Sequence, residues 1–234
     1  DVYVRGALAE SFSLALLPFL WLSIYKLIKI PKLKNAISAS LFLAFLLTTH
    51  NISTMMYVLP TAVWAFYWLF REKKMLSVYR LGLAGILGIG LSSFFLLPGI
   101  AEQELIQVSN LFSNYSDYRA HFVTINQLFI SRFWGDGPSI FGLEDGMSFQ
   151  IGWPHWWILA PLVIGGILWI RSNEKRQVLI LLSGLITLFL FSSFLTHPRS
   201  IFIWERIPLM SFIQFPWRFL GLSIFFVSFA SGAL

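Results

Sequence analysis

Carboxylate side chains stand where two long apolar segments begin or end, and carboxylates are the groups that most often move protons in enzymes. Glu10 closes the stretch DVYVRGALAE, and Glu102 follows Pro98-Gly99 in LPGIAEQELIQVSN. In a polar cavity, either carboxylate could act as a general base or position a hydroxyl nucleophile. The alternative interpretation is that both are solvated charges at the ends of apolar segments.

A histidine and an asparagine interrupt the uncharged run from Asn35 to Phe70. They are His50 and Asn51, in the stretch LLTTHNISTMM. The imidazole and the amide can donate hydrogen bonds to a phosphate or a sugar hydroxyl. The alternative is a polar turn, since turns tolerate polar residues that apolar segments do not. We predict a tight hairpin with this pair at its tip.

A second phosphate-type motif lies near the end of the chain, in IQFPWRFLGL, which contains Gln214, Trp217 and Arg218. Arg218 stands inside apolar sequence, where a charge needs a partner. A guanidinium matches a phosphate or carboxylate with two parallel hydrogen bonds, so a lipid-linked phosphate is one candidate partner. An ordinary lipid headgroup is the alternative, and the same two interpretations apply to Arg5.

Other kinds of site are excluded or disfavoured by what the sequence lacks. It contains no cysteine, no Gly-rich phosphate loop, no HExxH and no Ser nucleophile elbow. Asp136, Glu144 and Asp145 offer too few oxygen ligands at close spacing for calcium and are better interpreted as turns. We therefore predict neither a metal nor a cofactor.

The elements that must position these residues are membrane helices. The chain of 234 residues is 57% hydrophobic and only 12% charged, with a mean hydropathy of +0.73. A soluble domain of this length would carry about a quarter charged residues. The basic pI is therefore not a sign of nucleic-acid binding, and the ten Trp residues suit interfacial belts.

The apolar segments predict an all-α, polytopic transmembrane helix bundle of about seven spans in a single domain, residues 1–234. A span needs about 20 mostly apolar residues. The predicted spans are 8–28, 34–50, 52–70, 77–99, 151–170, 177–196 and 213–233, and Pro98-Gly99 is expected to end the fourth. The segment 100–150 is too long for a simple connection and is predicted to be a large external loop.

The distribution of charge predicts the orientation of the bundle. If the spans alternate, eleven of the seventeen Lys and Arg residues fall on one side with two acidic residues. The other side receives nine acidic residues and all four histidines. The positive-inside rule makes the basic side cytoplasmic, so the N-terminus and the 100–150 loop are expected outside.

Several motifs together resemble one family. DVYVRGALAE, TTHNIS and LPGIAEQELIQVSN, followed far downstream by IQFPWRFLGL, resemble the prokaryotic membrane proteins labelled 6-pyruvoyl-tetrahydropterin synthase-related. The resemblance extends along essentially the whole chain. A soluble pterin synthase would need a zinc-binding His cluster, which this sequence does not supply. The family is similar in turn to the GT-C superfamily of glycosyltransferases, which use polyprenyl-phosphate sugars at the outer leaflet.

The resemblance implies an integral membrane glycosyltransferase of the prokaryotic plasma membrane. Its partners would be membrane lipid, a polyprenyl-phosphate-linked sugar and an unidentified acceptor, with no nucleic acid. The superfamily uses an Asp or Glu of its first external loop, which we expect upstream of Asp1, in a longer protein. Among the residues given, Glu10 and Glu102 are candidates for base or positioning work. The candidates for the lipid phosphate are Arg5, His50, Asn51, Gln214, Trp217 and Arg218.

This hypothesis carries a structural expectation and leaves two alternatives open. The charged candidates and the His-Asn pair should line one cavity that opens toward the outer leaflet: Arg5, Glu10, His50, Asn51, Glu102 and Arg218. A polytopic transporter or lipid flippase is one alternative, although the sequence shows no inverted repeat and no pair of broken spans at matching positions. A non-catalytic membrane scaffold is the other.

Overall fold

A computed structural model describes residues 6–102, 105, 114–142, 145–169 and 176–232. Among these residues every regular element is helical, and the one β-bridge pairs Asp136 with Met147. The chain divides into two compact units, Asp1–Gln107 and Val108–Leu234, called unit 1 and unit 2 below. Arg5 lies outside the described residues.

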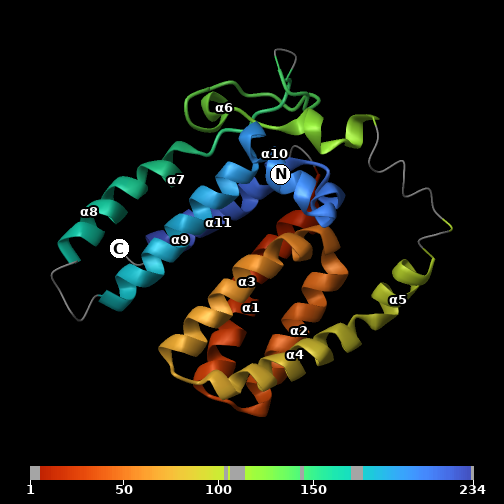
Figure 1. The fold of residues 1–234 in the computed structure, drawn as a ribbon, viewed down its shortest axis with the longest axis vertical. Coiled ribbons are helices and arrows are strands. Elements are labelled where there is room, and N and C mark those ends of the chain that lie inside the picture. The colour runs from red at the N-terminus through yellow and green to blue at the C-terminus, as the bar shows by residue number, and fades with distance from the viewer. Residues whose placement is uncertain (1–5, 103–104, 106–113, 143–144, 170–175, 233–234) are drawn as a thin grey trace. The chain divides into compact units, whose positions relative to one another are not determined.

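Unit 1 is a helical bundle (Figure 1) in which α1 packs against α2 and α3, and α2 against α4. Its elements are α1 (Leu8–Lys29), α2 (Leu33–Thr49), α3 (Asn51–Arg71), η1 (Met75–Ser77), α4 (Val78–Leu91) and α5 (Ser93–Ala101). Two indoles form the centre of the α1–α3 contact. Trp21 stacks on Trp64 with ring centroids 4.7 Å apart, and Trp64 Nε1 donates to the Trp21 carbonyl at 2.9 Å.

The fourth predicted span is broken, and not at the position that we expected. Helix α5 continues through Pro98-Gly99 to Ala101, whereas α4 and α5 meet at Ser92 with a bend of 69°. The Ser92 hydroxyl donates to the carbonyls of Gly88 and Ile89, both at 3.0 Å. Such back-bonding bends helices because the side chain competes with the backbone ladder. Ser92, rather than Pro98, therefore marks the position where this span breaks.

Close packing of α4 on α2 depends on Gly88. A Cβ added there would lie 2.9 Å from Leu43 Cδ2 and 3.0 Å from the Ser40 carbonyl oxygen. Beside it, Ser40 Oγ donates to the Ala84 carbonyl at 2.9 Å, which ties the two backbones together. Small residues that let helix backbones approach are the usual means of helix association in membranes.

We expect Gly88→Ala to destabilise unit 1 by about 1–3 kcal/mol, because the new methyl group meets a carbonyl oxygen that cannot rotate away. Thermal unfolding of the purified protein in lipid would measure this. Gly85→Ala is the matched control on the same helix, since its Cβ would meet no atom within 4 Å. The control should be neutral or slightly stabilising, because Ala is the better helix former. Equal behaviour of the two variants would contradict the packing argument.

Unit 2 combines apolar helices with a folded polar segment at one end (Figure 1). Its helices are α6 (Ile125–Phe129), α7 (Trp153–Trp157), α8 (Leu159–Trp169), α9 (Arg176–Leu195), α10 (Ile201–Arg206) and α11 (Phe219–Ser231). Its 3-10 turns are η4 (Asn114–Ser116), η5 (Tyr118–His121), η7 (Pro198–Ser200), η8 (Pro208–Ile213) and η9 (Pro216–Arg218). Helix α9 packs along α11, and the Ser223 hydroxyl lies 2.9 Å from that of Ser192.

Backbone hydrogen bonds fix the polar segment of unit 2 to its helices. The Val123 N–H donates to the Thr196 carbonyl at 2.8 Å, and the Ile151 N–H donates to the Leu128 carbonyl at 2.9 Å. These bonds bring the part that follows residue 114 beside the end of α9. The described part of the predicted 100–150 loop is therefore folded and held in place by backbone hydrogen bonds.

The predicted helical membrane protein is confirmed, whereas the number of spans is only partly established. By length and apolarity, three of the described helices can cross a membrane: α1, α3 and α9. The bent pair α4–α5 would make a fourth. Helix α2 and the segment Pro216–Ser231 are apolar but shorter, and the predicted span 151–170 forms two helices, α7 and α8. Seven spans stay a prediction.

Candidate functional site

A chain of polar side chains joins the first turns of α1 and α3; we call it the polar cluster, made of Glu10, Ser13, His50, Ser53 and Tyr57. Ser13 Oγ donates to the Glu10 carbonyl at 2.7 Å and lies 3.4 Å from the Tyr57 hydroxyl. Tyr57 lies about one helical turn after Ser53 on α3 and interacts electrostatically with Glu10. Ser53 Oγ lies 2.7 Å from His50 Nδ1. Ser13 therefore contacts the backbone of Glu10 rather than its carboxylate, and Glu10 and His50 lie at the two ends of this row of neighbouring polar residues.

The predicted hairpin tip is confirmed, and the structure gives His50 a local role. His50 is the single residue between α2 and α3, and its Nδ1 accepts the Ser53 N–H at 3.1 Å. It therefore caps α3 in the way that a serine or aspartate usually does. Because Nδ1 accepts this bond, the neutral ring carries its hydrogen on Nε2. Asn51 is exposed, and its Oδ1 accepts the N–H of Ile52.

The described basic residues of unit 1 lie at the end opposite to the polar cluster. Lys26 and Lys29 occupy the last turn of α1, and Arg71 occupies the last turn of α3. Lys74 Nζ donates to the Lys29 carbonyl at 2.6 Å, which places the two basic turns side by side. Unit 1 is therefore polarised along its helices, with the acid and the imidazole at one end and the cations at the other.

The second predicted acid, Glu102, is not brought into the polar cluster. It is exposed at the end of α5, a helix that Figure 1 shows leaning away from the start of α1. Within unit 1 the geometry therefore favours Glu10 over Glu102 as the carboxylate of a site. A solvated charge, the alternative interpretation of the sequence, fits the exposure of Glu102.

The other three predicted residues lie in one corner of unit 2, between η8 and α11. Gln214 has a φ of 63° and sits at the centre of a turn in which the Phe215 N–H donates to the Ile213 carbonyl at 2.7 Å. Such a turn is strained for any residue other than glycine, by about 1–3 kcal/mol. Arg218 Nη1 donates to the same Ile213 carbonyl, also at 2.7 Å. The guanidinium thus helps to hold the turn closed.

Aromatic rings surround this corner. Trp217 is buried and stacks on Phe215 with centroids 5.1 Å apart, and the Arg218 guanidinium lies 5.0 Å from the Phe215 ring centroid. The fully buried His121 ring packs against the other side of the corner, 4.6 Å from Phe215. Gln214, Trp217 and Arg218 are therefore a local cluster. The predicted single cavity would combine residues of both units and stays a prediction.

Two further histidines of unit 2 have structural partners. His121 Nδ1 lies 3.2 Å from Ser139 Oγ, and its Nε2 is hydrogen bonded to the Tyr115 carbonyl. His197 caps η7 by accepting the Arg199 N–H, and burial, with Arg199 nearby, lowers the pKa of its imidazole. A neutral imidazole that accepts a backbone N–H is a cap rather than a cation for an anionic ligand.

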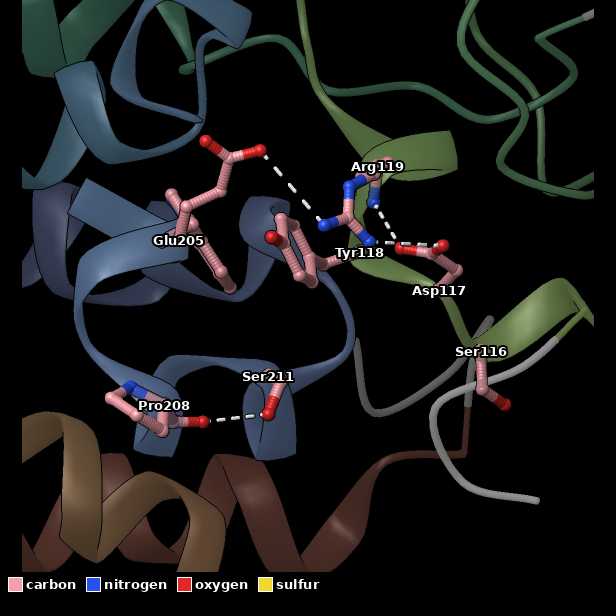
Figure 2. Close-up of a pocket in the computed structure, with 8 residues that line it drawn as sticks. Ser116, Asp117, Tyr118, Arg119, Glu205, Pro208 and Ser211 are labelled. Atoms are coloured by element: carbon pink, nitrogen blue, oxygen red, sulfur yellow. Dashed lines mark hydrogen bonds and ion pairs between the residues drawn. The ribbon is translucent and has the colours of Figure 1, made fainter. Parts of the chain in front are cut away.

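One group of charged residues was not singled out from the sequence. Arg119 lies between two carboxylates, with Nη1 3.4 Å from Asp117 Oδ2 and Nη2 3.9 Å from Glu205 Oε1. Figure 2 shows these side chains around a cavity of unit 2 with a volume of about 520 Å³. The sequence contained a weak signal, since Asp117, Tyr118 and Arg119 are consecutive, but Glu205 is 86 positions away from Arg119. Only folding brings it there.

Within the part of the chain that the structure describes, no group of three or more His, Asp or Glu side chains comes together to hold a metal. Of the three acids that the sequence placed in turns, Glu144 lies outside the described residues and Asp136 pairs with Met147 in the β-bridge. The Asp145 carboxylate accepts from Gln127 Nε2 at 2.8 Å and from the Met147 N–H at 3.3 Å, which uses both of its oxygens.

Comparison with known families agrees with the membrane architecture. A family model described as the 6-pyruvoyl-tetrahydropterin synthase related domain, a membrane protein, matches residues 2–144. This match extends over more than half of the chain. The chain belongs to this family. The match includes the whole polar cluster, together with Asp117 and Arg119 of unit 2. No curated protein and no solved structure matches the chain significantly.

Membership of the pterin synthase-related family identifies the chain as a membrane protein, in agreement with its apolar helices.

Proposed function

We propose that the protein is an integral membrane glycosyltransferase of the GT-C type. It would transfer a sugar from a polyprenyl-phosphate donor to an acceptor hydroxyl at the outer face of the membrane. The observation that supports the proposal is the polar cluster, which places the Glu10 carboxylate and the His50 imidazole at one end of an apolar helical unit. A carboxylate and an imidazole at one end of the membrane helices could serve acid–base chemistry at one face of the membrane.

The proposed reaction needs a base for the acceptor and hydrogen-bond donors for the departing phosphate, and the base comes from this end of unit 1. The Glu10 carboxylate takes the proton of the acceptor hydroxyl, and the acceptor oxygen forms a bond to the anomeric carbon of the sugar. The bond between that carbon and the phosphate oxygen breaks, and its electron pair leaves with the polyprenyl phosphate. His50 Nε2–H, the Asn51 amide and the cations Arg5 and Arg218 are the candidate donors to the departing phosphate.

The polarity of unit 1 supports the orientation in the proposal. Its basic end carries the turns near Lys29 and Lys74, which the positive-inside rule assigns to the cytoplasm. The polar cluster would then face the opposite side, where polyprenyl-phosphate sugars are used. In this proposal the shorter apolar helices complete about seven spans in a prokaryotic plasma membrane.

A direct test follows the departure of the lipid phosphate. Full-length protein in lipid nanodiscs is incubated with a polyprenyl-phosphate hexose and a set of acceptors, and free polyprenyl phosphate is quantified by mass spectrometry. Release by the wild type is expected. Arg218→Ala should reduce it about tenfold, because a charge-assisted hydrogen bond to phosphate is lost. Arg132→Ala, which removes an arginine stacked on Trp153 in the same unit, is the matched control and should leave release unchanged.

The outcomes separate the candidate functions. Release that falls equally in both arginine variants would keep the enzyme but remove Arg218 from its site. Absence of release with every hexose and acceptor would contradict the proposal and favour a transporter, a flippase or a scaffold. Movement of the intact lipid-linked sugar across the bilayer without release would identify a flippase.

A further inference from the structure

The cavity of unit 2 is built by segments that are far apart in the sequence. Its walls come from η5 with the preceding Asp117, from α10 and from η8 (Figure 2). Its volume of about 520 Å³ lies within the usual range for small-molecule sites. The two 3-10 segments are held locally: the Asp117 carboxylate caps η5 by accepting the Arg119 N–H at 3.0 Å, and Ser211 Oγ donates to the Pro208 carbonyl at 2.7 Å.

Donors and acceptors alternate across the cavity. The Arg119 guanidinium lies between the carboxylates of Asp117 and Glu205, and Figure 2 shows the two acids on opposite sides of it. The three side chains are 54%, 32% and 52% exposed for Arg119, Asp117 and Glu205 respectively. Ion pairs this exposed contribute little to stability. The side chains of Arg119 and Glu205 are therefore accessible to a ligand that enters the cavity.

Two aromatic rings also support the Arg119 guanidinium. Its guanidinium lies 4.9 Å from the centroid of the Tyr118 ring, and that ring stacks on Trp204 at 5.1 Å with an angle of 20° between the planes. Trp204 is only 1% exposed, and its Nε1 donates to the Leu195 carbonyl at 3.1 Å. The guanidinium thus rests on a rigid aromatic base, and a preorganised donor loses less entropy when it binds.

The charges define the class of ligand. Two carboxylates and one guanidinium give the cavity a formal charge of −1, which disfavours phosphates and other anions. Each hydroxyl of a sugar ring can donate one hydrogen bond and accept others. Neighbouring hydroxyls can therefore donate to the carboxylates of Asp117 and Glu205 and accept from the Arg119 guanidinium between them. Burial raises the pKa of Tyr118, so this phenol stays neutral at the edge of the site.

We propose that this cavity binds a neutral saccharide unit, through hydrogen bonds between vicinal hydroxyls of the sugar and the side chains of Asp117, Arg119 and Glu205. The inference goes beyond the proposed function, because binding at this cavity does not require that any sugar is transferred. If the protein is a glycosyltransferase, this cavity is the candidate site for a glycan acceptor.

The test measures binding alone. Full-length protein is placed in nanodiscs, so that no sugar-based detergent competes, and is titrated with methyl glucoside, methyl galactoside and methyl mannoside. Saturation-transfer NMR detects contact and gives the Kd. Binding of at least one glycoside is expected. Glu205→Gln and Asp117→Asn should each raise its Kd about tenfold or more, because each removes a charge-assisted acceptor. Asp136→Asn, an exposed acid outside the cavity, is the matched control.

Each result decides for or against the inference. Binding that both cavity variants weaken and the control leaves intact supports it, provided that the thermal unfolding midpoints are unchanged. If one cavity variant fails to fold, the other decides. Absence of binding by all three glycosides would overturn it, and so would equal binding by cavity and control variants. Displacement of the glycoside by inorganic phosphate or by Ca²⁺ would assign the cavity to an ion instead. None of these readouts depends on release of polyprenyl phosphate.

Discussion

Glu10→Gln is expected to lower the release of polyprenyl phosphate by about two to four orders of magnitude, the usual contribution of a general base. The amide has the same shape as the carboxylate but cannot accept the proton of the acceptor hydroxyl. Ser13 donates to the backbone carbonyl of Glu10, which the substitution leaves in place, so the polar cluster should keep its geometry. The measurement is the rate of release at saturating donor.

Glu102→Gln is the matched comparison, because it makes the same chemical change at an exposed carboxylate on the end of α5. Its rate should stay near that of the wild type. A loss in Glu102→Gln with full activity in Glu10→Gln would exchange the roles of the two acids. Full activity in both variants would place the base outside them both and contradict the role that we give to the polar cluster.

Trp21→Ala is expected to destabilise unit 1 by about 3–5 kcal/mol, the range for removing a large buried aromatic side chain. Trp21 is 1% exposed, stacks on Trp64 across the α1–α3 contact, and donates from Nε1 to Thr61 Oγ1 at 3.0 Å. The substitution removes the ring stack and leaves a cavity. It also removes the hydrogen bond that the indole donates to the Thr61 hydroxyl. Thermal or denaturant unfolding in lipid would measure the loss.

Phe12→Ala on the same helix is the control for this prediction. Phe12 is 58% exposed on the outside of unit 1, so its removal creates no internal cavity. Its effect should stay within about 0.5 kcal/mol, as for most exposed substitutions. Similar losses in the two variants would mean that the stacked indoles do not hold α1 on α3.

The helices themselves could be predicted closely from the sequence. The predicted segment 8–28 is α1, 34–50 is α2, 52–70 is α3 and 177–196 is α9, each within one residue at either end. Long apolar runs bounded by charged or polar residues leave few other conformations in a membrane, where every backbone group has to be paired within the helix. The one-residue hairpin at His50 was predictable for the same reason.

Irregular backbone was harder to predict. The expected helix 213–233 begins only at Phe219, because Pro208 and Pro216 start 3-10 turns and Gln214 adopts a positive φ. The break in the fourth span arises from a serine that bonds back to its own helix, a choice made by side-chain rotamer rather than by composition. Neither feature changes the hydropathy of its segment, and so neither was visible in it.

For the candidate site, the sequence indicated which residues are chemically able to act, but not which of them meet. It singled out Glu10 and His50, and it missed Ser13, Ser53 and Tyr57, which join them. These hydroxyl side chains are common in membrane helices, and nothing local distinguishes those that face a neighbouring helix. The same holds for Glu205, which acquires its partner Arg119 only when α10 packs beside η5.

The sequence by itself determined that this is a helical membrane protein, because hydropathy is a sum over residues. The tertiary structure decided that Glu10 lies in one row of polar residues with His50 while Glu102 does not, and that Asp117, Arg119 and Glu205 line a cavity. Those outcomes depend on helix packing and on loop hydrogen bonds between distant residues. Such contacts are set by the shapes of both partners, which no single segment of sequence contains.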